Sequence, residues 1–353
     1  MKILRSKAMT ASLAIVLAIA TAGCSSSQPS TSSTNSSKVG TAATVAATEA
    51  PKKIDYPTKA INVAQGHAPG GGADQMYQLT KPFLEKILKQ NLLTTYKTGA
   101  DGAINWKEIA EMKGAKADGY TLSPMISPKM QLNSFNNKNA GFKMEDYVGI
   151  ANIFFDPGIL VVEPNSPFKT FKDFIDYAKA NPGKLKLAHS GDGGDDWYNA
   201  LMIGKLTSVK FNLVPFAGDG PAWMAAAGGN VEANMNNLGV VSAQIKGGKL
   251  RALAIYADKR HPDFPDVPTL KELGVDFSEG SYRGFNAPKD TPKEIVKILA
   301  DDIEQMTKDP EFIKVAKAAN LDIMFLRDQE LQKFIDKITK NSEQIIKEME
   351  TVK

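Results

Sequence analysis

Short strand-like runs alternate with helix-like segments from Ile54 onward, and this alternation limits the fold more than any other feature of the sequence. The runs cover residues 60–65, 91–96, 120–123, 158–162, 185–189, 211–216 and 250–256, and helical patterns separate nearly all of them. Strands that alternate with helices are typical of α/β proteins with parallel sheets. A chain of 353 residues is also long enough to form two domains of this kind.

Three segments carry specific signals for a helix: two predicted helix starts and the C-terminal end of the chain. Residues 170–173 and 291–294 both have the form of a capping box, and the second adds Pro292 at the first helical position. The last stretch repeats apolar residues at helical spacing, namely Leu331, Phe334, Ile335, Ile338, Ile345, Ile346 and Met349. This spacing predicts an amphipathic C-terminal helix that docks on a domain.

Composition narrows the range of partners. The chain has 43 Lys and Arg residues against 39 Asp and Glu residues, and three of the basic residues lie in residues 1–23. This near balance argues against nucleic acid or an anionic membrane surface as the main partner. One Cys excludes a disulfide framework, and one Cys with three His residues argues against a structural zinc site. We therefore expect neither a built-in metal nor a cofactor.

The N-terminal segment reads as a targeting signal. Residues 1–23 contain basic residues, then an apolar run, then small residues, which is the order of a secretory signal. Cys24 follows directly, so the segment resembles a bacterial lipoprotein signal, in which this Cys receives lipid; the alternative is ordinary cleavage with Cys24 uninvolved. Residues 24–53 are rich in Ser, Thr and Ala and predict a flexible tether that spans about 30 Å. We expect an extracytoplasmic protein, lipid-anchored to the cell membrane in a periplasm or at the outer face of the cytoplasmic membrane.

Three glycine-rich turns lie between a strand-like run and a helical pattern, at residues 68–74, 98–102 and 190–196. Where a strand, such a turn and a helix meet, backbone N–H groups point to one spot and the helix dipole favours negative charge. The first turn matches neither the dinucleotide motif nor the Walker motif, so it suits a carboxylate or a simple phosphate. The alternative is that its glycines serve only backbone geometry. Because ligands of open α/β sheets bind beyond the carboxyl ends of the strands, these turns form the candidate site.

Six short motifs, each weak alone, occur in a specific order and spacing. They are Tyr56-Pro57, residues 68–72 (APGGG) with Asp74, 118–122 (DGYTL), 214–216 (VPF), 247–254 (GGKLRALA) and 266–270 (DVPTL). With them the chain resembles the extracytoplasmic solute receptors of tripartite tricarboxylate transporters, the TctC or Bug family. The resemblance implies a type II periplasmic-binding-protein fold, with two α/β lobes and a hinge between them. Lobe I then comprises residues 54–155 and 281–353, and lobe II comprises residues 156–280.

The resemblance also implies a function. A receptor of this family captures a small organic acid, a carboxylate, between its lobes and delivers it unreacted to a membrane permease. We expect a monomer with these ligand-binding residues: His67, Pro69, Gly70, Gly71, Gly72, Asp74, Ser127, Ser190, Gly191, Asp192, Gly193, Asp195, Phe216, Ala217, Gly218, Asp219 and Asn236. His67 directly precedes the first turn and can make the affinity depend on pH. Trp197, after the third turn, is the aromatic candidate for stacking on a ligand ring.

Three departures from the family pattern bear on the ligand. Gly66-His67 replaces Pro-Phe before the first turn, the third turn is acidic, and Arg283 replaces an apolar residue at the expected second crossover. Asp residues at a helix start act as caps that complement the dipole. The alternative is that Asp195 or Asp219 faces an ammonium group or a metal-bound carboxylate of the ligand. Uncompensated carboxylates repel a wholly anionic ligand, which argues against a polycarboxylate.

Catalytic patterns do not occur in the sequence. His67, His189 and His261 are the only imidazoles; none belongs to H-E-x-x-H, and residues 189–191 lack the G-x-S-x-G nucleophile elbow. We therefore do not expect an enzyme. The alternative function is a ligand sensor or an extracytoplasmic enzyme on the same scaffold.

Overall fold

The structure of the chain, a computed structural model, describes residues 54–351, with side chains through Lys347. The predicted signal, Cys24 and the tether lie outside the described residues. Within this stretch, no helix combines the length and the apolarity that crossing a membrane requires.

Ten strands and ten α-helices make up the described residues. In chain order they are β1 (Ile61–Gln65), α1 (Gly72–Leu88), β2 (Leu92–Tyr96), α2 (Ala103–Ala110), β3 (Thr121–Ser127), α3 (Lys129–Asn136), β4 (Tyr147–Val162), α4 (Phe171–Ala180), β5 (Lys186–His189), α5 (Asp195–Thr207), β6 (Asn212–Pro215), α6 (Asp219–Ala227), β7 (Ala233–Asn237), α7 (Leu238–Lys246), β8 (Arg251–Tyr256), β9 (Gly280–Pro288), α8 (Lys293–Thr307), α9 (Pro310–Ala318), β10 (Asp322–Arg327) and α10 (Asp328–Thr351). Short 3-10 turns lie at Ala100–Gly102, Gly114–Lys116 and Met144–Asp146. Each strand-like run predicted from the sequence falls on a strand.

The strands join in the order β2-β1-β3-β9-β4-β7-β5-β6, and β8 and β10 also pair with β4. Two groups are parallel, as the alternation predicts: β1 with β2 and β3, and β5 with β6 and β7. By contrast, β4 and β9 run antiparallel to each other and to their other neighbours. The prediction of parallel sheets is therefore right inside each group and wrong for the strands that join the groups.

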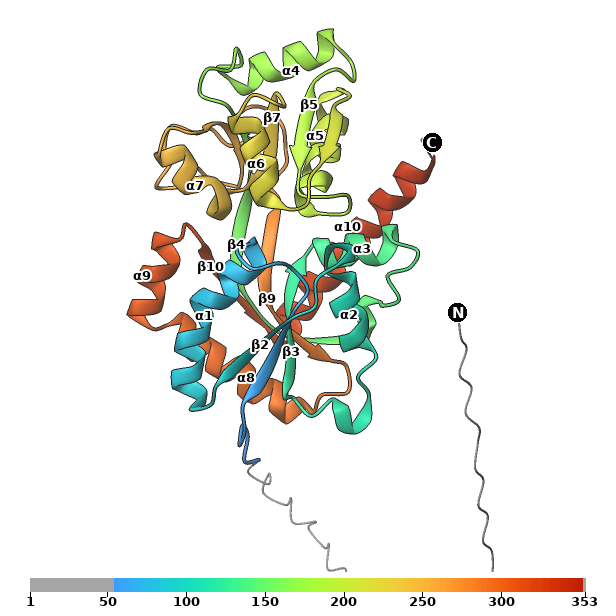
Figure 1. Ribbon diagram of the computed structural model, residues 1–353, viewed down its shortest axis with the longest axis vertical. Coiled ribbons are helices and arrows are strands. Elements are labelled where there is room, and N and C mark those ends of the chain that lie inside the picture. The colour runs from blue at the N-terminus through green and yellow to red at the C-terminus, as the bar shows by residue number, and fades with distance from the viewer. Residues whose placement is uncertain (1–53, 352–353) are drawn as a thin grey trace, which may run out of the picture. The chain divides into compact units, whose positions relative to one another are not determined.

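Strand β4 belongs to both groups. It pairs with β9 as far as Asp156 and Pro157, and from Gly158 onward it pairs with β7 and β8. Figure 1 shows β4 and β9 running between a lobe with α1 to α3, α8 and α9 (lobe I) and a lobe with α4 to α7 (lobe II). Gly280 and Gly284 let β9 approach β4, because a Cβ at either position would overlap the β4 backbone. The two-lobed α/β fold is confirmed.

Each lobe has its own apolar core between its strands and helices. In lobe I, Val63 and Phe285 are buried in a cluster with residues of α1, α8 and α9. In lobe II, Leu187 and Tyr256 are buried in a cluster with residues of α4 and α5. Burying one such side chain contributes about 1.5–3 kcal/mol. These cores fix the strand ends from which the glycine-rich turns extend.

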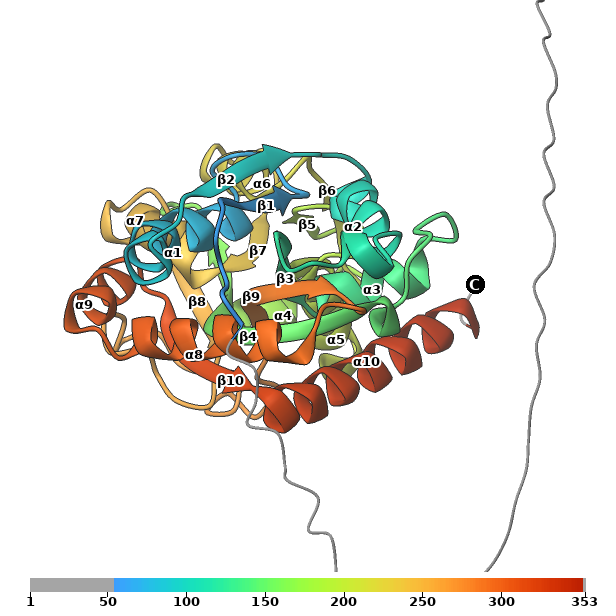
Figure 2. The same cartoon turned by 90° about the horizontal axis from the view of Figure 1, so that it is seen from below.

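The C-terminal helix α10 contacts both cores. Leu331 and Ile335 pack with Met125 of β3, and Ile346 belongs to the lobe II cluster, which also contains Leu132 of α3. Figure 2 shows α10 running from the end of β10 past β4 and α3. The helix is amphipathic as predicted, it packs mainly against α3, β4 and β10, and Ile346 extends this packing to the lobe II cluster.

One of the two predicted capping boxes forms. Thr170 Oγ1 accepts a hydrogen bond from the N–H of Asp173 at 3.1 Å, and the return bond to the N–H of Thr170 is 2.9 Å, so this prediction is confirmed. At α8, Pro292 takes the N-cap position, and Thr291 Oγ1 has no hydrogen-bond partner among the described residues. The second capping box is therefore wrong.

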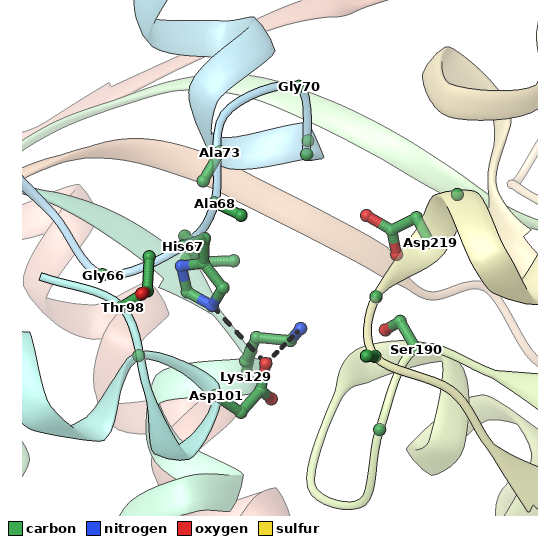
Figure 3. Close-up of a pocket in the computed structure, with 18 of the residues that line it drawn as sticks. Gly66, His67, Ala68, Gly70, Ala73, Thr98, Asp101, Lys129, Ser190 and Asp219 are labelled. Atoms are coloured by element: carbon green, nitrogen blue, oxygen red, sulfur yellow. Dashed lines mark hydrogen bonds and ion pairs between the residues drawn. The ribbon is translucent and has the colours of Figure 1, made fainter. Parts of the chain in front are cut away.

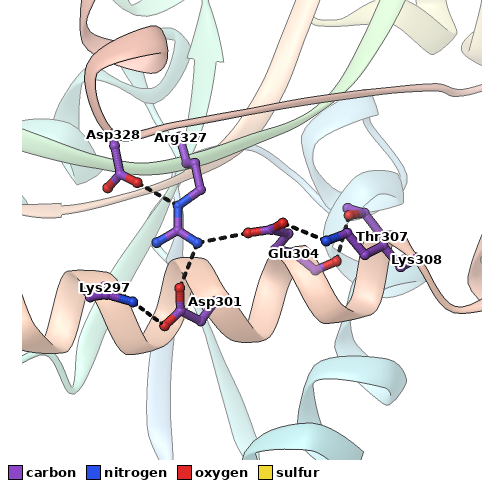
Figure 4. A network of polar contacts seen from close by, with 7 residues as sticks. All are labelled: Lys297, Asp301, Glu304, Thr307, Lys308, Arg327 and Asp328. Atoms are coloured by element: carbon purple, nitrogen blue, oxygen red, sulfur yellow. Dashed lines mark hydrogen bonds and ion pairs between the residues drawn. The ribbon is translucent and has the colours of Figure 1, made fainter.

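Arg327 connects β10 to α8 (Figure 4). Its Nη1 lies 2.6 Å from Asp301 Oδ1 and 2.9 Å from Glu304 Oε2, and its Nε lies 2.7 Å from Asp328 Oδ2. Only 17% of the Arg327 side chain is exposed. A guanidinium shared among three carboxylates is more stabilising than an isolated surface pair, which contributes about 0–1 kcal/mol.

Candidate functional site

A cavity of about 720 Å³ lies between the lobes, within the usual range for small-molecule sites (Figure 3). Its walls come from the three glycine-rich turns, the loop before α6 and the start of β9. Most of the predicted binding residues line it, namely His67, Pro69, Gly70, Gly71, Gly72, Ser190, Gly191, Asp195, Phe216, Ala217, Gly218 and Asp219. The structure thus brings residues of both lobes to one space.

Asp74 holds the first turn in shape. Its Oδ2 accepts the N–H of Gly70 at 2.9 Å, and its Oδ1 accepts the hydroxyl of Tyr96 at 2.7 Å. Gly70 has φ of +83°, a left-handed conformation that favours glycine. The turn leads directly into α1, whose first N–H groups have no acceptor within the helix. Asp74 is buried behind the turn and does not line the cavity.

Arg283 of β9 lies against this helix start. A Cβ on Gly72 would be 2.6 Å from Nη2 of Arg283, so the guanidinium sits directly beside the first residue of α1. Nη2 pairs with Asp156 Oδ2 at 2.8 Å, and Nε donates to Ser281 Oγ at 3.2 Å. Nη1 has no hydrogen-bond partner among the described residues, although the residue is only 2% exposed. The guanidinium of Arg283 is therefore a buried cation that lines the cavity, and its Nη1 has no hydrogen-bond acceptor among the described residues.

Asp156 balances the charge of Arg283 from behind. Burial raises the pKa of Asp156 to about 6, although Arg283 and the N–H of Gly239 oppose the rise. That N–H donates to Asp156 Oδ1 at 2.8 Å. A buried ion pair needs such additional hydrogen bonds to offset the loss of hydration. The pair leaves little net charge at this wall.

Lys129, at the start of α3, is the second cation of the cavity (Figure 3). Its Nζ lies 3.1 Å from Asp101 Oδ1 in the second turn, and His67 Nε2 lies 3.6 Å from the same oxygen. Burial alone would raise the pKa of Asp101, but Lys129 and His67 bring it below its usual value. Burial also lowers the pKa of Lys129, yet the charges of nearby carboxylates raise it above its usual value. Those carboxylates are Asp101, Asp219, Asp195 and Asp196.

Lobe II contributes carboxylates to its side of the cavity. Asp195 begins α5 and Asp219 begins α6. Asp195 Oδ2 accepts a hydrogen bond from Asn237 Nδ2 at 3.0 Å. The carboxylate of Asp219 has no hydrogen bond or ion pair with any described residue, and Figure 3 shows it pointing toward the first turn. Neither carboxylate has a cation of its own in lobe II within the described residues.

Asp196 supports the third turn from inside the lobe. Its carboxylate accepts the N–H of Ser190 at 2.5 Å, the hydroxyl of Ser190 at 3.0 Å and the N–H of Trp197 at 3.0 Å. Burial, followed by the charges of Asp195 and Asp219, raises its pKa to about 8. In the acidic third turn, the carboxylate of Asp196 therefore holds the backbone in shape, and Asp195 lines the cavity.

Besides Asp74, five predicted site residues lie outside the lining: Ser127, Asp192, Gly193, Trp197 and Asn236. Ser127 is buried and accepts a hydrogen bond from Gln131, while Asn236 donates to Asn234. Trp197 packs in the lobe II core, so its ring does not face a ligand. The Asp192 side chain is 66% exposed, beside His189, and Gly193 follows it with φ of +89°.

Several lining residues are not among the predicted ligand-binding residues. The second turn belongs to the predicted candidate site, but none of its residues is predicted to bind ligand, and Arg283 is noted only as a departure at the expected second crossover. Lys129 and Asn237 carry no local signal that distinguishes them from other polar residues. Within residues 54–351, no group of three or more His, Cys, Asp or Glu side chains is placed to hold a metal ion.

Known proteins are similar to this chain in sequence and in fold. The family model described as “Tripartite tricarboxylate transporter family receptor” matches residues 77–351. BugT of Bordetella pertussis is 31% identical over 258 residues, which cover 71% of this chain and 77% of BugT. MatC of Rhodopseudomonas palustris with bound malate is 24% identical, with a TM-score of 0.74 over 82% of this chain and all of MatC. A second R. palustris protein, with adipate, is 24% identical, with a TM-score of 0.77 over 83% of this chain and 98% of that one.

At this identity the two R. palustris structures show a shared fold and nothing more. The family match covers most of the chain, from within α1 to the end of α10, and so includes parts of both lobes. The chain therefore belongs to the tripartite tricarboxylate transporter receptor family, the TctC or Bug group of extracytoplasmic solute receptors.

Proposed function

We propose that this receptor binds a small organic acid in the cavity and delivers it to the membrane permease of a tripartite transporter. One observation carries the proposal: Nη1 of Arg283, buried and without a partner among the described residues, stands beside the start of α1 at Gly72. Nη1 lacks an acceptor among the described residues, and the first N–H groups of a helix lack one within the helix, so a carboxylate can accept from both. The ligands named for the two R. palustris proteins, malate and adipate, are carboxylates as well.

The binding energy requires both lobes. One charge-assisted hydrogen bond contributes about 1.5–3 kcal/mol, while micromolar affinity needs about 8 kcal/mol. Several donors must therefore act together, and lobe II must close on the ligand. We place the hinge where β4 changes partners, between Asp156 and Gly158, and at Gly280 of β9, so that lobe II comprises residues 156–280. Closure of this hinge is the signal that the permease reads.

The N-terminal residues set the location. A lipid on Cys24 and the tether of residues 24–53 would hold a monomeric receptor near the permease. The supporting features are the basic, apolar and small segments of residues 1–23 and the position of Cys24 directly after them. The receptor would thus sample ligand outside the cytoplasm without leaving the membrane surface.

A thermal-shift screen tests the proposal, with the chain that lacks residues 1–23 and carries Cys24→Ser to prevent lipidation. The compounds are mono-, di- and tricarboxylates, amino acids, aromatic acids and neutral sugars. We expect stabilisation by at least one compound with a carboxylate, by about 2.7 kcal/mol at one hundred times its Kd. Stabilisation by sugars alone, or by no carboxylate at all, would contradict the proposal. Recovery of the bound compound with its mass unchanged distinguishes a receptor from an enzyme.

A further inference from the structure

The charges that line the cavity are divided unequally between the lobes. Lobe I and β9 supply Lys129 and Arg283, and each already has a carboxylate partner, Asp101 and Asp156 respectively. Lobe II supplies Asp195 and Asp219, and neither forms an ion pair with a described residue. The unused donor of Arg283, Nη1, is thus at one wall, and carboxylates that have no direct ion pair among the described residues are at the other.

We propose that the ligand is a small amino acid, whose carboxylate binds Arg283 and the start of α1 and whose ammonium group binds Asp219 and Asp195. This inference rests on the proposed function and adds the second charge of the ligand. An unpartnered Nη1 on a residue that is 2% exposed needs a hydrogen-bond acceptor, and a carboxylate oxygen is a strong one. The partly exposed carboxylate of Asp219 lines the cavity with no hydrogen bond or ion pair in the described residues, so it is free to accept a hydrogen bond from a ligand ammonium group.

The charge count argues against a dicarboxylate. One carboxylate of such a ligand can use Arg283, but the second would then approach Asp195 or Asp219. Lys129 forms its ion pair with Asp101 at 3.1 Å, and the charges of Asp219 and Asp195 act on it without such a direct pair. Burial is the main cause of the raised pKa of Asp196, and the charges of Asp195 and Asp219 raise it further, as expected where carboxylates repel one another. An ammonium group removes this repulsion, whereas a second carboxylate adds to it.

Calorimetric titration of ligand pairs that differ only in the amino group tests the inference. Suitable pairs are propionate with β-alanine, butyrate with 4-aminobutyrate, succinate with aspartate, and glutarate with glutamate. We expect the amino member of at least one pair to bind ten times or more tighter than its partner. If the compound without the amino group binds equally or better in every pair, the inference fails and the proposed function stands. If no member of any pair binds, with or without calcium, the inference fails, whereas the proposed function fails only if the wider set of carboxylates in the thermal-shift screen also gives no stabilisation.

Asp219→Asn assigns the ammonium site. We expect the amino acid to lose affinity tenfold or more, while the matching acid without the amino group keeps its affinity or gains. Asp276→Asn removes the same charge from the same lobe at a side chain that is 96% exposed, and it should change neither affinity. Equal losses for both ligands in Asp219→Asn, or no loss for either, would overturn the assignment. Because Asp219 has no side-chain partner to lose, the variant should unfold at the wild-type temperature without ligand, which separates misfolding from lost recognition.

Discussion

Gly72→Ala tests the contact between the first turn and Arg283. A Cβ at position 72 would lie 2.6 Å from Nη2 and 2.7 Å from Cζ of Arg283, closer than such atoms approach in folded proteins. The guanidinium cannot move away freely, because it is buried and holds Asp156 at 2.8 Å. The added methyl group must therefore displace either the ion pair or the start of α1.

The expected cost follows from this geometry. Overpacking of a closely packed site destabilises by about 1–3 kcal/mol, and removing one member of a buried ion pair by about 3–5 kcal/mol. Since Gly72→Ala shifts the pair without deleting it, we expect a loss of about 1–3 kcal/mol. Ligand affinity should fall roughly 10- to 100-fold, because one charge-assisted bond of about 1.5–3 kcal/mol is misaligned.

Gly71→Ala is the matched control for stability. A Cβ there meets only the carbonyl oxygen of Ala68 at 3.6 Å, an ordinary contact, and φ of −75° suits any residue. We expect its unfolding free energy to stay within about 0.5 kcal/mol of wild type. Urea unfolding followed by circular dichroism gives the stabilities, and calorimetry with a ligand from the screen gives the affinity of Gly72→Ala. Equal stability of the two variants would refute the packing argument, and wild-type affinity of Gly72→Ala would refute the role of Arg283.

Three further predictions concern stability and location. Arg327→Ala should lower the unfolding free energy by about 1–2 kcal/mol in urea, and less in 1 M salt, because three carboxylates lose their shared cation; a loss that salt does not reduce would point to packing instead. Burial holds the pKa of Asp156 near 6 and that of Asp196 near 8, above the usual 3.8, so between pH 4 and 8 the folded state keeps protons that the unfolded state has lost. Stability should therefore fall as pH rises through this window, and melting temperatures that climb steadily instead would contradict the assignment. Cys24→Ser should move the protein from the membrane fraction to the soluble fraction after cell lysis, and unchanged fractionation would exclude lipid on this residue as the anchor.

Local sequence patterns predicted the strands that end in glycine-rich turns, because there a short run with apolar or β-branched residues is followed by a clear turn and a helix start. They missed β7, β9 and β10, and for β7 and β9 the reason is physical. Strand β7 contains three Asn residues, which are disfavoured in strands. Their burial is compensated by hydrogen bonds such as Asn234 to Ala188 O and Asn237 to Asp195, and these partners come from other parts of the chain. Strand β9 needs glycines for its approach to β4, and glycine lowers any strand prediction.

In the candidate site, too, local features could be predicted and contacts between distant residues could not. The backbone of the first and third turns could be found, since a glycine-rich turn before a helix is a local pattern. The contact between Gly72 and Arg283 could not, because the two residues are far apart in the sequence and meet only through the pairing of β9 with β3. Whether a carboxylate such as Asp74 or Asp219 faces the turn or the cavity depends on side-chain partners that spacing does not specify.

Helix α10 makes closure depend on residues that no ligand touches. Because Leu331 is packed in lobe I and Ile346 in lobe II, a rotation of one lobe must bend the helix or release one of these anchors. Withdrawing a buried Ile costs about 1.5–3 kcal/mol, which is comparable to one good contact with the solute. Packing of α10 thus helps to set the angle between the lobes in the absence of ligand. Substitutions in this helix can therefore change ligand affinity while the residues that line the cavity stay the same.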